Sequence, residues 1–351
     1  MEKNAQKLNQ LKDVLKGKKT LLVVMQNYPD PDALASAAAL REIARNTDGI
    51  QCTVTSGGIV GRAENRTLAK YLHLPYHTID KLDIEKYDLI ALVDTQPSTG
   101  NNDLPDTVTP DIVIDHHPIK RATRSVPFTD VRSRYGACST ILFEYLKMAG
   151  IEIEMKIATA LLYGIRSDTQ DLGRESSKED IEAYLELYPQ VNKKVLRDIQ
   201  VARTPRSYFR MLEAALSNAW VYGRAIVSNI GQIDIPDIIG EIADLTLRDE
   251  DATWTLCYGF YNGQILLSIR TAETDGNAGK VMSRIVKDKG TGGGHHTMAG
   301  GQIPCKDLNA KEKKELEELI LKRFLGALNI TNFDKARLVK SESKTEKEQK
   351  A

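Results

Sequence analysis

Short apolar runs alternate with longer amphipathic stretches in the first half of the chain. The runs are rich in Leu, Ile and Val, as the buried strands of a parallel sheet are, and the stretches between them carry apolar residues at helical spacing. This alternation is typical of β-α-β units and predicts an α/β domain over residues 1–180, with a mainly parallel β-sheet and flanking helices. Strands are predicted over residues 20–26, 52–56, 87–94 and 111–116, and helices over residues 33–45, 62–72, 137–148 and 154–165.

The pattern changes in the second half, after a charged segment over residues 181–207 that we interpret as a connector. Residues 208–332 predict a smaller C-terminal α/β domain. Within it, Asn262-Gly263 suits the type I′ turn of a hairpin. Residues 333–351 are mostly polar and lack periodicity, so they predict a disordered tail. The strands expected in the second domain cover residues 219–227, 253–261 and 264–271, and the helices cover residues 235–247 and 277–287.

Charge and cysteine content narrow the class of protein. The chain of 351 residues has 48 Lys and Arg and 48 Asp and Glu, so its net charge is zero. This balance argues against a protein that binds long nucleic acid through many contacts to the phosphate groups. The 4 cysteines are scattered without a C-x-x-C pair, so neither a zinc knuckle nor a disulfide framework is indicated. The apolar run over residues 21–25 is too short for a signal sequence or a membrane span. We therefore expect a cytoplasmic protein without a membrane partner.

Acidic side chains follow several of the apolar segments, and the one after residues 112–114 is extended by two histidines. Ligands of open parallel sheets bind outside the carboxyl ends of the strands, where these side chains are expected to meet. Carboxylates suit hard divalent cations, and imidazole favours manganese among them. A single aspartate at such a point is more often a helix cap, but the ordered set predicts a hydrolytic metal centre. The set comprises Asp30, Asp32, Asp94, Asp115, His116, His117 and Asp168.

These residues stand in four ordered segments, Asp30-Pro31-Asp32-Ala33-Leu34-Ala35-Ser36, Val93-Asp94-Thr95, Asp115-His116-His117 and Ser167-Asp168-Thr169. The second half contains Ser268-Ile269-Arg270 and the glycine-rich segment over residues 292–301. The first four segments resemble the ordered motifs of the DHH phosphoesterase family, and the last two resemble its DHH-associated C-terminal domain. The resemblance extends over both predicted domains.

The resemblance implies a role for each of these residues. One ion would be held by Asp30 and Asp94, and the other by Asp32, Asp94, His116 and Asp168. Asp115 would orient an imidazole, and His117 would stabilise charge or donate a proton beside the scissile phosphate. Substrate would be bound by Arg270, Gly292, Gly293, Gly294 and His295.

Gln26 departs from the family pattern, which has a histidine four residues before the first aspartate. An amide oxygen ligates a divalent ion more weakly than imidazole does. We therefore expect two Mn2+ positions, one of them weaker, with Mg2+ or Co2+ as alternative ions.

The expected function is metal-dependent hydrolysis of phosphoester bonds. The resemblance points to enzymes that degrade very short oligoribonucleotides and dephosphorylate adenosine 3′,5′-bisphosphate. One alternative is a phosphodiesterase of cyclic or linear dinucleotide second messengers, and another is a nucleotide sensor in which Gln26 marks a weakened metal site. An inorganic pyrophosphatase and a processive exonuclease fit the sequence less well. A homodimer is compatible with the resemblance, although no surface feature of the sequence indicates one.

Overall fold

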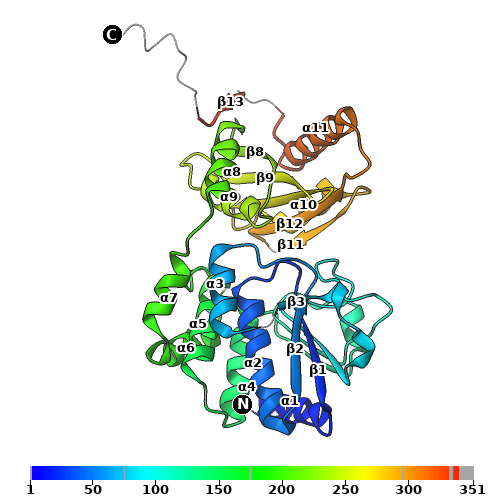
Figure 1. The fold of residues 1–351 in the computed structure, drawn as a ribbon. Helices are drawn as coiled ribbons and strands as arrows, with labels where there is room; N and C mark the ends of the chain where they lie inside the picture. The colour runs from blue at the N-terminus through cyan, green and yellow to red at the C-terminus, as the bar shows by residue number, and fades with distance from the viewer. Residues whose placement is uncertain (1, 75, 174–175, 295, 332–334, 340–351) are drawn as a thin grey trace. The chain divides into compact units, whose positions relative to one another are not determined.

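The computed structural model describes residues 2–74, 76–173, 176–294, 296–331 and 335–339. The chain divides into two compact units, Met1–Arg203 and Thr204–Ala351 (Figure 1). Each unit has its own β-sheet and its own hydrophobic core. No helix in the described ranges combines the length and the apolar character that a membrane span requires.

The first unit contains a parallel sheet whose described strands follow the order β3-β2-β1-β4-β5-β6. The predicted α/β fold is thereby confirmed. Because the carboxyl ends of parallel strands lie along one edge, the segments that leave β1, β4 and β5 start at neighbouring points. The strands are β1 (Thr20–Val24), β2 (Gln51–Ser56), β3 (Tyr76–Thr78), β4 (Leu89–Val93), β5 (Ile112–Asp115) and β6 (Phe128–Val131).

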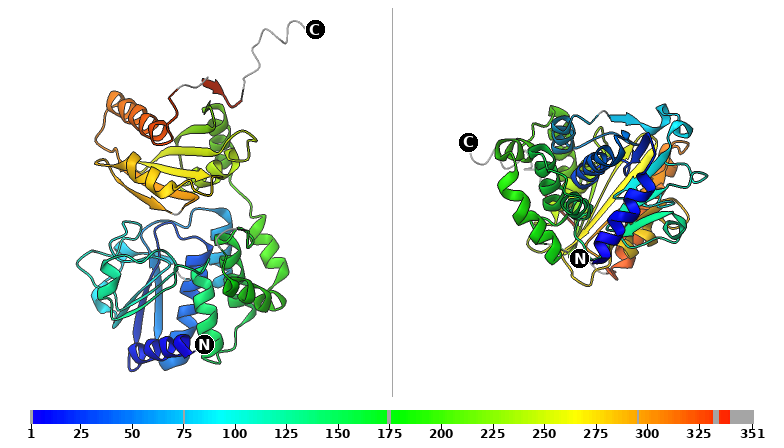
Figure 2. Two further views of the ribbon diagram at one scale, coloured as in Figure 1. Left: turned by 180° about the vertical axis from the view of Figure 1, so that it is seen from behind. Right: turned by 90° about the horizontal axis from the view of Figure 1, so that it is seen from below.

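Helices cover one face of this sheet, and loops with short 3-10 helices cover the other (Figure 2). Leu21 and Val23 of β1 face the helices, whereas Leu22 and Val24 pack with Ile79 on the opposite face. The α-helices are α1 (Glu2–Leu15), α2 (Pro31–Asp48), α3 (Ala63–Leu72), α4 (Cys138–Met148), α5 (Met155–Asp168), α6 (Lys178–Leu187) and α7 (Lys193–Gln200). The 3-10 helices are η1 (Ile79–Lys81), η2 (Ile84–Lys86), η3 (Ala122–Ser125) and η4 (Tyr188–Gln190).

The segment interpreted as a connector, residues 181–207, differs from that expectation. Most of it lies in α6, η4 and α7, which pack against the helices of the first unit. A capping box between Ser177 and Asp180 starts α6, and Leu187, Leu196 and Ile199 are buried. Leu196 and Ile199 of α7 are three residues apart, as on one face of a helix, and the charged residues of α7 lie on its other faces. The division between the units follows Arg203.

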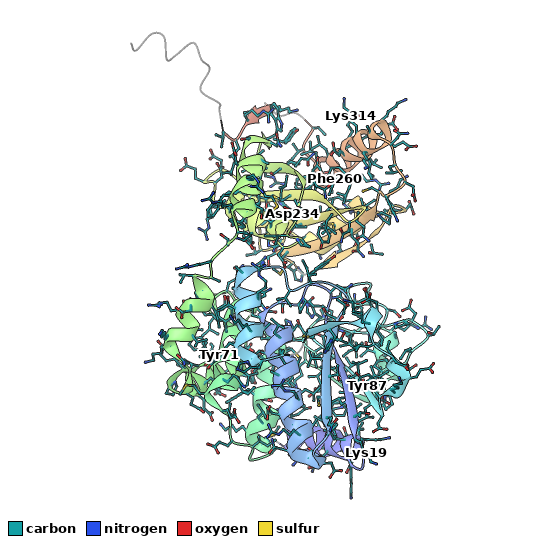
Figure 3. The ribbon with its side chains drawn as sticks, in the orientation of Figure 1. Lys19, Tyr71, Tyr87, Asp234, Phe260 and Lys314 are labelled. Carbon is teal, nitrogen blue, oxygen red and sulfur yellow. The ribbon has the colours of Figure 1, made fainter. Side chains whose placement is uncertain are left out.

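The second unit contains a mixed sheet in the order β11-β12-β10-β9-β8-β7-β13, in which only the β8–β9 pairing is parallel among the described strands. Helices α10 and α11 pack on one face, and α8 and α9 on the other. Phe260, labelled in Figure 3, lies beside α11, where Lys313 Nζ is 6.0 Å from its ring centroid.

The elements of this unit are β7 (Ala219–Tyr222), β8 (Ala225–Gln232), β9 (Trp254–Tyr261), β10 (Gln264–Thr271), β11 (Thr291–Gly294), β12 (Met298–Pro304), β13 (Lys335–Arg337), α8 (Arg206–Ser217), α9 (Ile238–Thr246), α10 (Ala278–Val286) and α11 (Ala310–Ala327). The predicted hairpin is confirmed, because Asn262 and Gly263 both have positive φ, 45° and 76°, as a type I′ turn requires.

Two expectations for this unit are wrong. The single strand expected over residues 219–227 is a hairpin of β7 and β8, because the chain turns at Gly223, where φ is 57°. Residues 335–337, expected within a disordered tail, form β13 and pair with β7. Arg337 and Lys335 each lie 4.0 Å from the ring of Trp220, a cation–π contact that helps to hold this strand. Residues 340–351 lie outside the described residues.

Candidate metal centre

Asp30 and Gln26 lie in the segment that joins β1 to α2. Asp30 is the N-cap of α2, and its Oδ1 accepts a hydrogen bond of 2.9 Å from the backbone N–H of Ala33. Its Oδ2 accepts a hydrogen bond of 2.6 Å from Gln26 Nε2. Loss of hydration and the neighbouring charge of Asp32 raise the pKa of Asp30.

Asp32 is completely buried in the first turn of α2. The start of α4 holds its carboxylate, since the backbone N–H groups of Cys138 and Ser139 donate hydrogen bonds of 2.6 Å and 2.7 Å to its two oxygens. Burial and the nearby charge of Asp168 raise the pKa of Asp32 to about 6. Gly164 of α5 lies directly against this carboxylate, because a Cβ at that position would be 3.1 Å from Asp32 Oδ1.

Asp94 follows β4 and turns the chain with a left-handed φ of 56°. Its backbone N–H donates to Ile114 O at 3.0 Å, which ties this turn to β5. Its Oδ1 is buried and makes no hydrogen bond among the described residues, while its Oδ2 lies 3.4 Å from Gln26 Nε2. Burial and the charge of Asp30 raise the pKa of Asp94 well above its usual value.

His116 brings the acidic side chains together. Its Nε2 lies 3.3 Å from Asp168 Oδ2, 3.4 Å from Asp94 Oδ1 and 4.0 Å from Asp32 Oδ2. On the other side of the ring, Nδ1 lies 3.2 Å from Tyr135 O. Because a carbonyl oxygen can only accept, this contact places a proton on Nδ1 and, in the neutral ring, the lone pair on Nε2. Burial lowers the pKa of His116, but Asp168 and Asp94 outweigh it and raise the pKa well above the usual value.

His117 is held by Asp115, and Asp115 is held in turn by Gln96. Asp115 Oδ1 lies 2.8 Å from His117 Nδ1 and accepts a hydrogen bond of 2.8 Å from the backbone N–H of His116. Its Oδ2 accepts a hydrogen bond of 2.5 Å from Gln96 Nε2. Burial opposes ionisation, but the charge of His117 and these hydrogen bonds lower the pKa of Asp115 below its usual range.

Two groups of side chains in the described residues could hold a metal ion. One is Asp32, His116 and Asp168, the other is Asp94, His116 and His117, and within each group the ligand atoms lie within 4.8 Å of one another. Carboxylate oxygen with imidazole nitrogen suits Mn2+ and related divalent cations. The buried Asp94 Oδ1 without a hydrogen bond also fits, because a cation would satisfy it. Burial and the charge of Asp30 raise the pKa values of Asp94 and Asp168, and these two carboxylates raise the pKa of His116; a divalent cation would balance this excess of negative charge.

The structure thus brings together Gln26, Asp30, Asp32, Asp94, Asp115, His116, His117 and Asp168 in the first unit. Three further contributors were not predicted from the sequence: the side chain of Gln96, the carbonyl group of Tyr135 and the small size of Gly164. A carbonyl contact carries no sequence signal. Gln96 follows the candidate ligand Asp94 by two residues, and this spacing is too common in proteins to indicate a supporting role.

The substrate-binding residues expected in the second unit lie on its sheet. Arg270 of β10 is buried, and its Nε donates a hydrogen bond of 2.6 Å to Asp244 Oδ1 while Nη1 donates to Ser268 Oγ at 2.8 Å. Gly292, Gly293 and Gly294 form most of β11, an exposed strand at the sheet edge. His295 lies outside the described residues.

A parallel α/β sheet with carboxylates and imidazoles gathered at its carboxyl edge defines a class of metal-dependent hydrolases. The family model described as "DHH family, N-terminal domain" matches residues 21–165, and the model described as "DHHA1 domain" matches residues 223–324. The chain belongs to the DHH family and is a phosphoesterase of that superfamily, as its motifs predicted.

Known proteins similar to this chain include one that aligns with most of it. The uncharacterized protein MJ1633 of Methanocaldococcus jannaschii is 32% identical over an alignment of 351 positions, and the alignment covers 94% of this chain and 71% of that protein. A probable manganese-dependent inorganic pyrophosphatase of Lactiplantibacillus plantarum is 30% identical over 149 residues, covering 42% of this chain and 47% of that protein. The solved structure of an exopolyphosphatase-related protein from Bacteroides fragilis has a TM-score of 0.69 at 15% identity and covers 92% of this chain and 98% of that one, a likeness of fold.

Proposed function

We propose that this protein is a manganese-dependent phosphoesterase that hydrolyses very short oligoribonucleotides and adenosine 3′,5′-bisphosphate. The observation that carries the proposal is the convergence of three carboxylates, from Asp32, Asp94 and Asp168, on Nε2 of His116. These four side chains would hold the cation. When bound, a divalent cation supplies a Lewis acid that lowers the pKa of water and stabilises charge on a phosphoryl group.

His117 is the residue proposed to act on the leaving group. Its side chain is 34% exposed, in contrast to the 8% of His116, so a substrate phosphate can reach it. With Nδ1 engaged by Asp115, the ring presents Nε2 as the atom that meets a phosphoryl oxygen. In its protonated form His117 would donate its Nε2 proton to the leaving oxygen as the bond from phosphorus to that oxygen breaks and the oxygen of water bonds to phosphorus. The attacking water would release its own proton to solvent. Asp115 is a positioning residue, because it fixes the ring and compensates its charge.

Substrate recognition is assigned to the second unit. An edge strand leaves alternate backbone N–H groups unpaired by the sheet, and the glycines of β11 allow a phosphate or base to approach them closely. Arg270 is fixed by Asp244 through Nε, and a guanidinium carries five N–H donors with which to bind phosphate.

Manganese and a short substrate are supported by separate observations. One relative carries manganese dependence in its name, and the mixed carboxylate and imidazole ligand set suits that ion. The balance of 48 basic and 48 acidic residues disfavours a long polyanion, whose binding requires a surplus of Lys and Arg. A nucleotide of two or a few residues requires few phosphate contacts.

Turnover of a substrate panel tests the proposal. The purified full chain is incubated with Mn2+ and pApA, adenosine 3′,5′-bisphosphate, cyclic diadenylate or pyrophosphate, and the products are separated by chromatography. The wild type is expected to consume pApA and adenosine 3′,5′-bisphosphate fastest. Asp94→Ala is expected to be inactive, and Asp13→Ala, which removes an exposed carboxylate of α1, is expected to match the wild type.

The other outcomes identify the alternatives. Preference for cyclic diadenylate would assign the protein to second-messenger breakdown, and preference for pyrophosphate would overturn the nucleotide assignment. Nucleotide binding without turnover would favour a sensor. Activity in Asp94→Ala equal to that of the wild type would reject the metal centre as the catalytic site.

A further inference from the structure

The two groups that could hold a metal ion meet at a single atom. Both include His116, whose Nε2 is the ring nitrogen that lies among Asp32, Asp94 and Asp168. Its Nδ1 is engaged by Tyr135 O at 3.2 Å and is not available to a second ion. An imidazole nitrogen has one lone pair in the ring plane and ligates one cation at a time. The two groups therefore surround one ion position.

A second position would have to lie between Asp30 and the other oxygen of Asp94, and there the structure places an amide. Gln26 Nε2 donates to Asp30 Oδ2 at 2.6 Å and lies 3.4 Å from Asp94 Oδ2. Asp30 Oδ1 points to the start of α2, where it caps the helix and accepts a hydrogen bond of 2.9 Å from the backbone N–H of Ala33. Amide N–H groups donate hydrogen bonds and do not ligate cations, so this bridge links the two carboxylates without adding a metal ligand.

We infer that this centre holds one tightly bound divalent cation, on His116, Asp32, Asp94 and Asp168, and that the Gln26 amide takes the place of a second cation between Asp30 and Asp94. The inference rests on the metal-dependent site of the proposed function but not on the identity of the substrate. It makes Gln26 the residue that sets the metal stoichiometry. It also departs from the two Mn2+ positions expected from the sequence.

Manganese binding to the metal-free full chain tests this inference without any substrate. Equilibrium dialysis with elemental analysis counts the ions, and electron paramagnetic resonance distinguishes an isolated Mn2+ from a spin-coupled pair. The wild type is expected to bind one Mn2+ tightly, with the spectrum of an isolated ion. His116→Ala is expected to lose this ion. Two Mn2+ bound with similar affinity, or a spin-coupled spectrum, would overturn the inference.

Gln26→His tests the role of the amide directly. An imidazole at this position offers a ligand in place of a donor, so the stoichiometry is expected to rise from one to two and coupling is expected to appear. Gln10→His is the matched control, because it adds a histidine on the exposed side of α1. If Gln26→His folds, as judged by circular dichroism, and still binds one ion, the result would contradict the role of Gln26 in setting the number of bound ions. A wild type that binds no Mn2+ would instead contradict the metal-dependent function itself.

Discussion

Gln96 shows how a neutral side chain can fix a charged one. Its amide is almost completely buried and makes contacts in two directions, donating to Asp115 Oδ2 at 2.5 Å and accepting at Oε1 from Thr123 Oγ1 and the backbone N–H of Lys120, both at 2.8 Å. Asp115 is therefore held from both ends, by Gln96 and by His117. At the scale of the residue, the position of His117 depends on a side chain that touches neither metal nor substrate.

Replacing Gln96 with Ala is expected to lower kcat about 10- to 100-fold, the usual effect of losing such a supporting partner. KM and the affinity for Mn2+ are expected to stay close to the wild-type values, because the Gln96 amide bonds to Asp115, Lys120 and Thr123 and supports His117 rather than the proposed metal ligands. Steady-state kinetics on pApA and manganese dialysis measure the three quantities. Gln51→Ala, at an exposed position of β2, is the control, and an unchanged kcat in Gln96→Ala would contradict the positioning role.

Replacing Gly164 with Ala is expected to destabilise the first unit by about 1–3 kcal/mol, the usual cost of overpacking. The new Cβ would collide with Ser139 Oγ and would lie 3.1 Å from Asp32 Cα, so the Ser139 side chain would have to turn and the backbone of α2 would have to move slightly away from α5. Gly326 of α11 has no heavy atom within 4 Å of an added Cβ, and Gly326→Ala is expected to be neutral or to stabilise its helix by up to about 1 kcal/mol. Urea unfolding compares the two variants, and equal stabilities would show that the contact at Gly164 is not tight.

At the scale of the element, the apolar periodicity predicted most of what the structure contains in the first unit. The expected strands and helices that lead to the candidate site are all present, because parallel strands buried on both faces give unmistakable apolar runs. The elements without a long apolar run were not predicted: β3, β6 and the short 3-10 helices. Helix α1 was not predicted either, although Leu8, Leu11 and Leu15 are spaced as on one face of a helix and could have indicated it.

Asp180, in the first turn of α6, links that helix to the segment that supports the candidate site. Its buried carboxylate caps α6 and accepts from the backbone N–H of Gly136 at 2.7 Å and from Thr140 Oγ1 at 2.5 Å. Gly136 directly follows Tyr135, whose carbonyl contacts His116. Thus the cap of α6 also holds the loop that supports the imidazole.

Asp180→Ala is expected to destabilise the first unit by about 3 kcal/mol, because it removes a helix cap and leaves buried donors without acceptors. Manganese affinity is expected to fall as well, since the Tyr135 loop loses its anchor. Thermal unfolding and manganese dialysis give the two results. Asp198→Ala, at an exposed position of α7, is expected to stay within about 0.5 kcal/mol of the wild type. A loss of stability no larger than in that control would contradict the anchoring role of Asp180.

At the scale of the whole molecule, each unit carries a separate hydrophobic core, and every candidate metal ligand belongs to the first unit. Most of these ligands were expected from the sequence because they follow the buried strands β1, β4 and β5, whereas Asp168 ends helix α5. The hydrogen bonds of Gln26 could not be predicted from the sequence. Whether its amide donates a hydrogen bond through Nε2 or ligates a cation through Oε1 depends on the atoms that surround it in the folded protein.

A fragment of residues 1–203 is expected to fold and to bind Mn2+ with the affinity of the full chain, because its core and ligands are complete. It is expected to hydrolyse pApA at least about 100-fold more slowly, since binding energy from the substrate-holding unit would be missing. Circular dichroism, dialysis and kinetics measure these properties. Full turnover by the fragment would contradict the role proposed for the second unit.

Removal and return of the metal tests the central claim most directly. The full chain is stripped with a chelator, and hydrolysis of pApA is followed before and after Mn2+ is added, for the wild type and for Asp94→Asn, which keeps the size of the side chain but lacks its charge. The account predicts no hydrolysis by the stripped wild type, full recovery with Mn2+, and no recovery in Asp94→Asn. Hydrolysis that survives chelation, or that returns in Asp94→Asn to the level of the wild type, would contradict it.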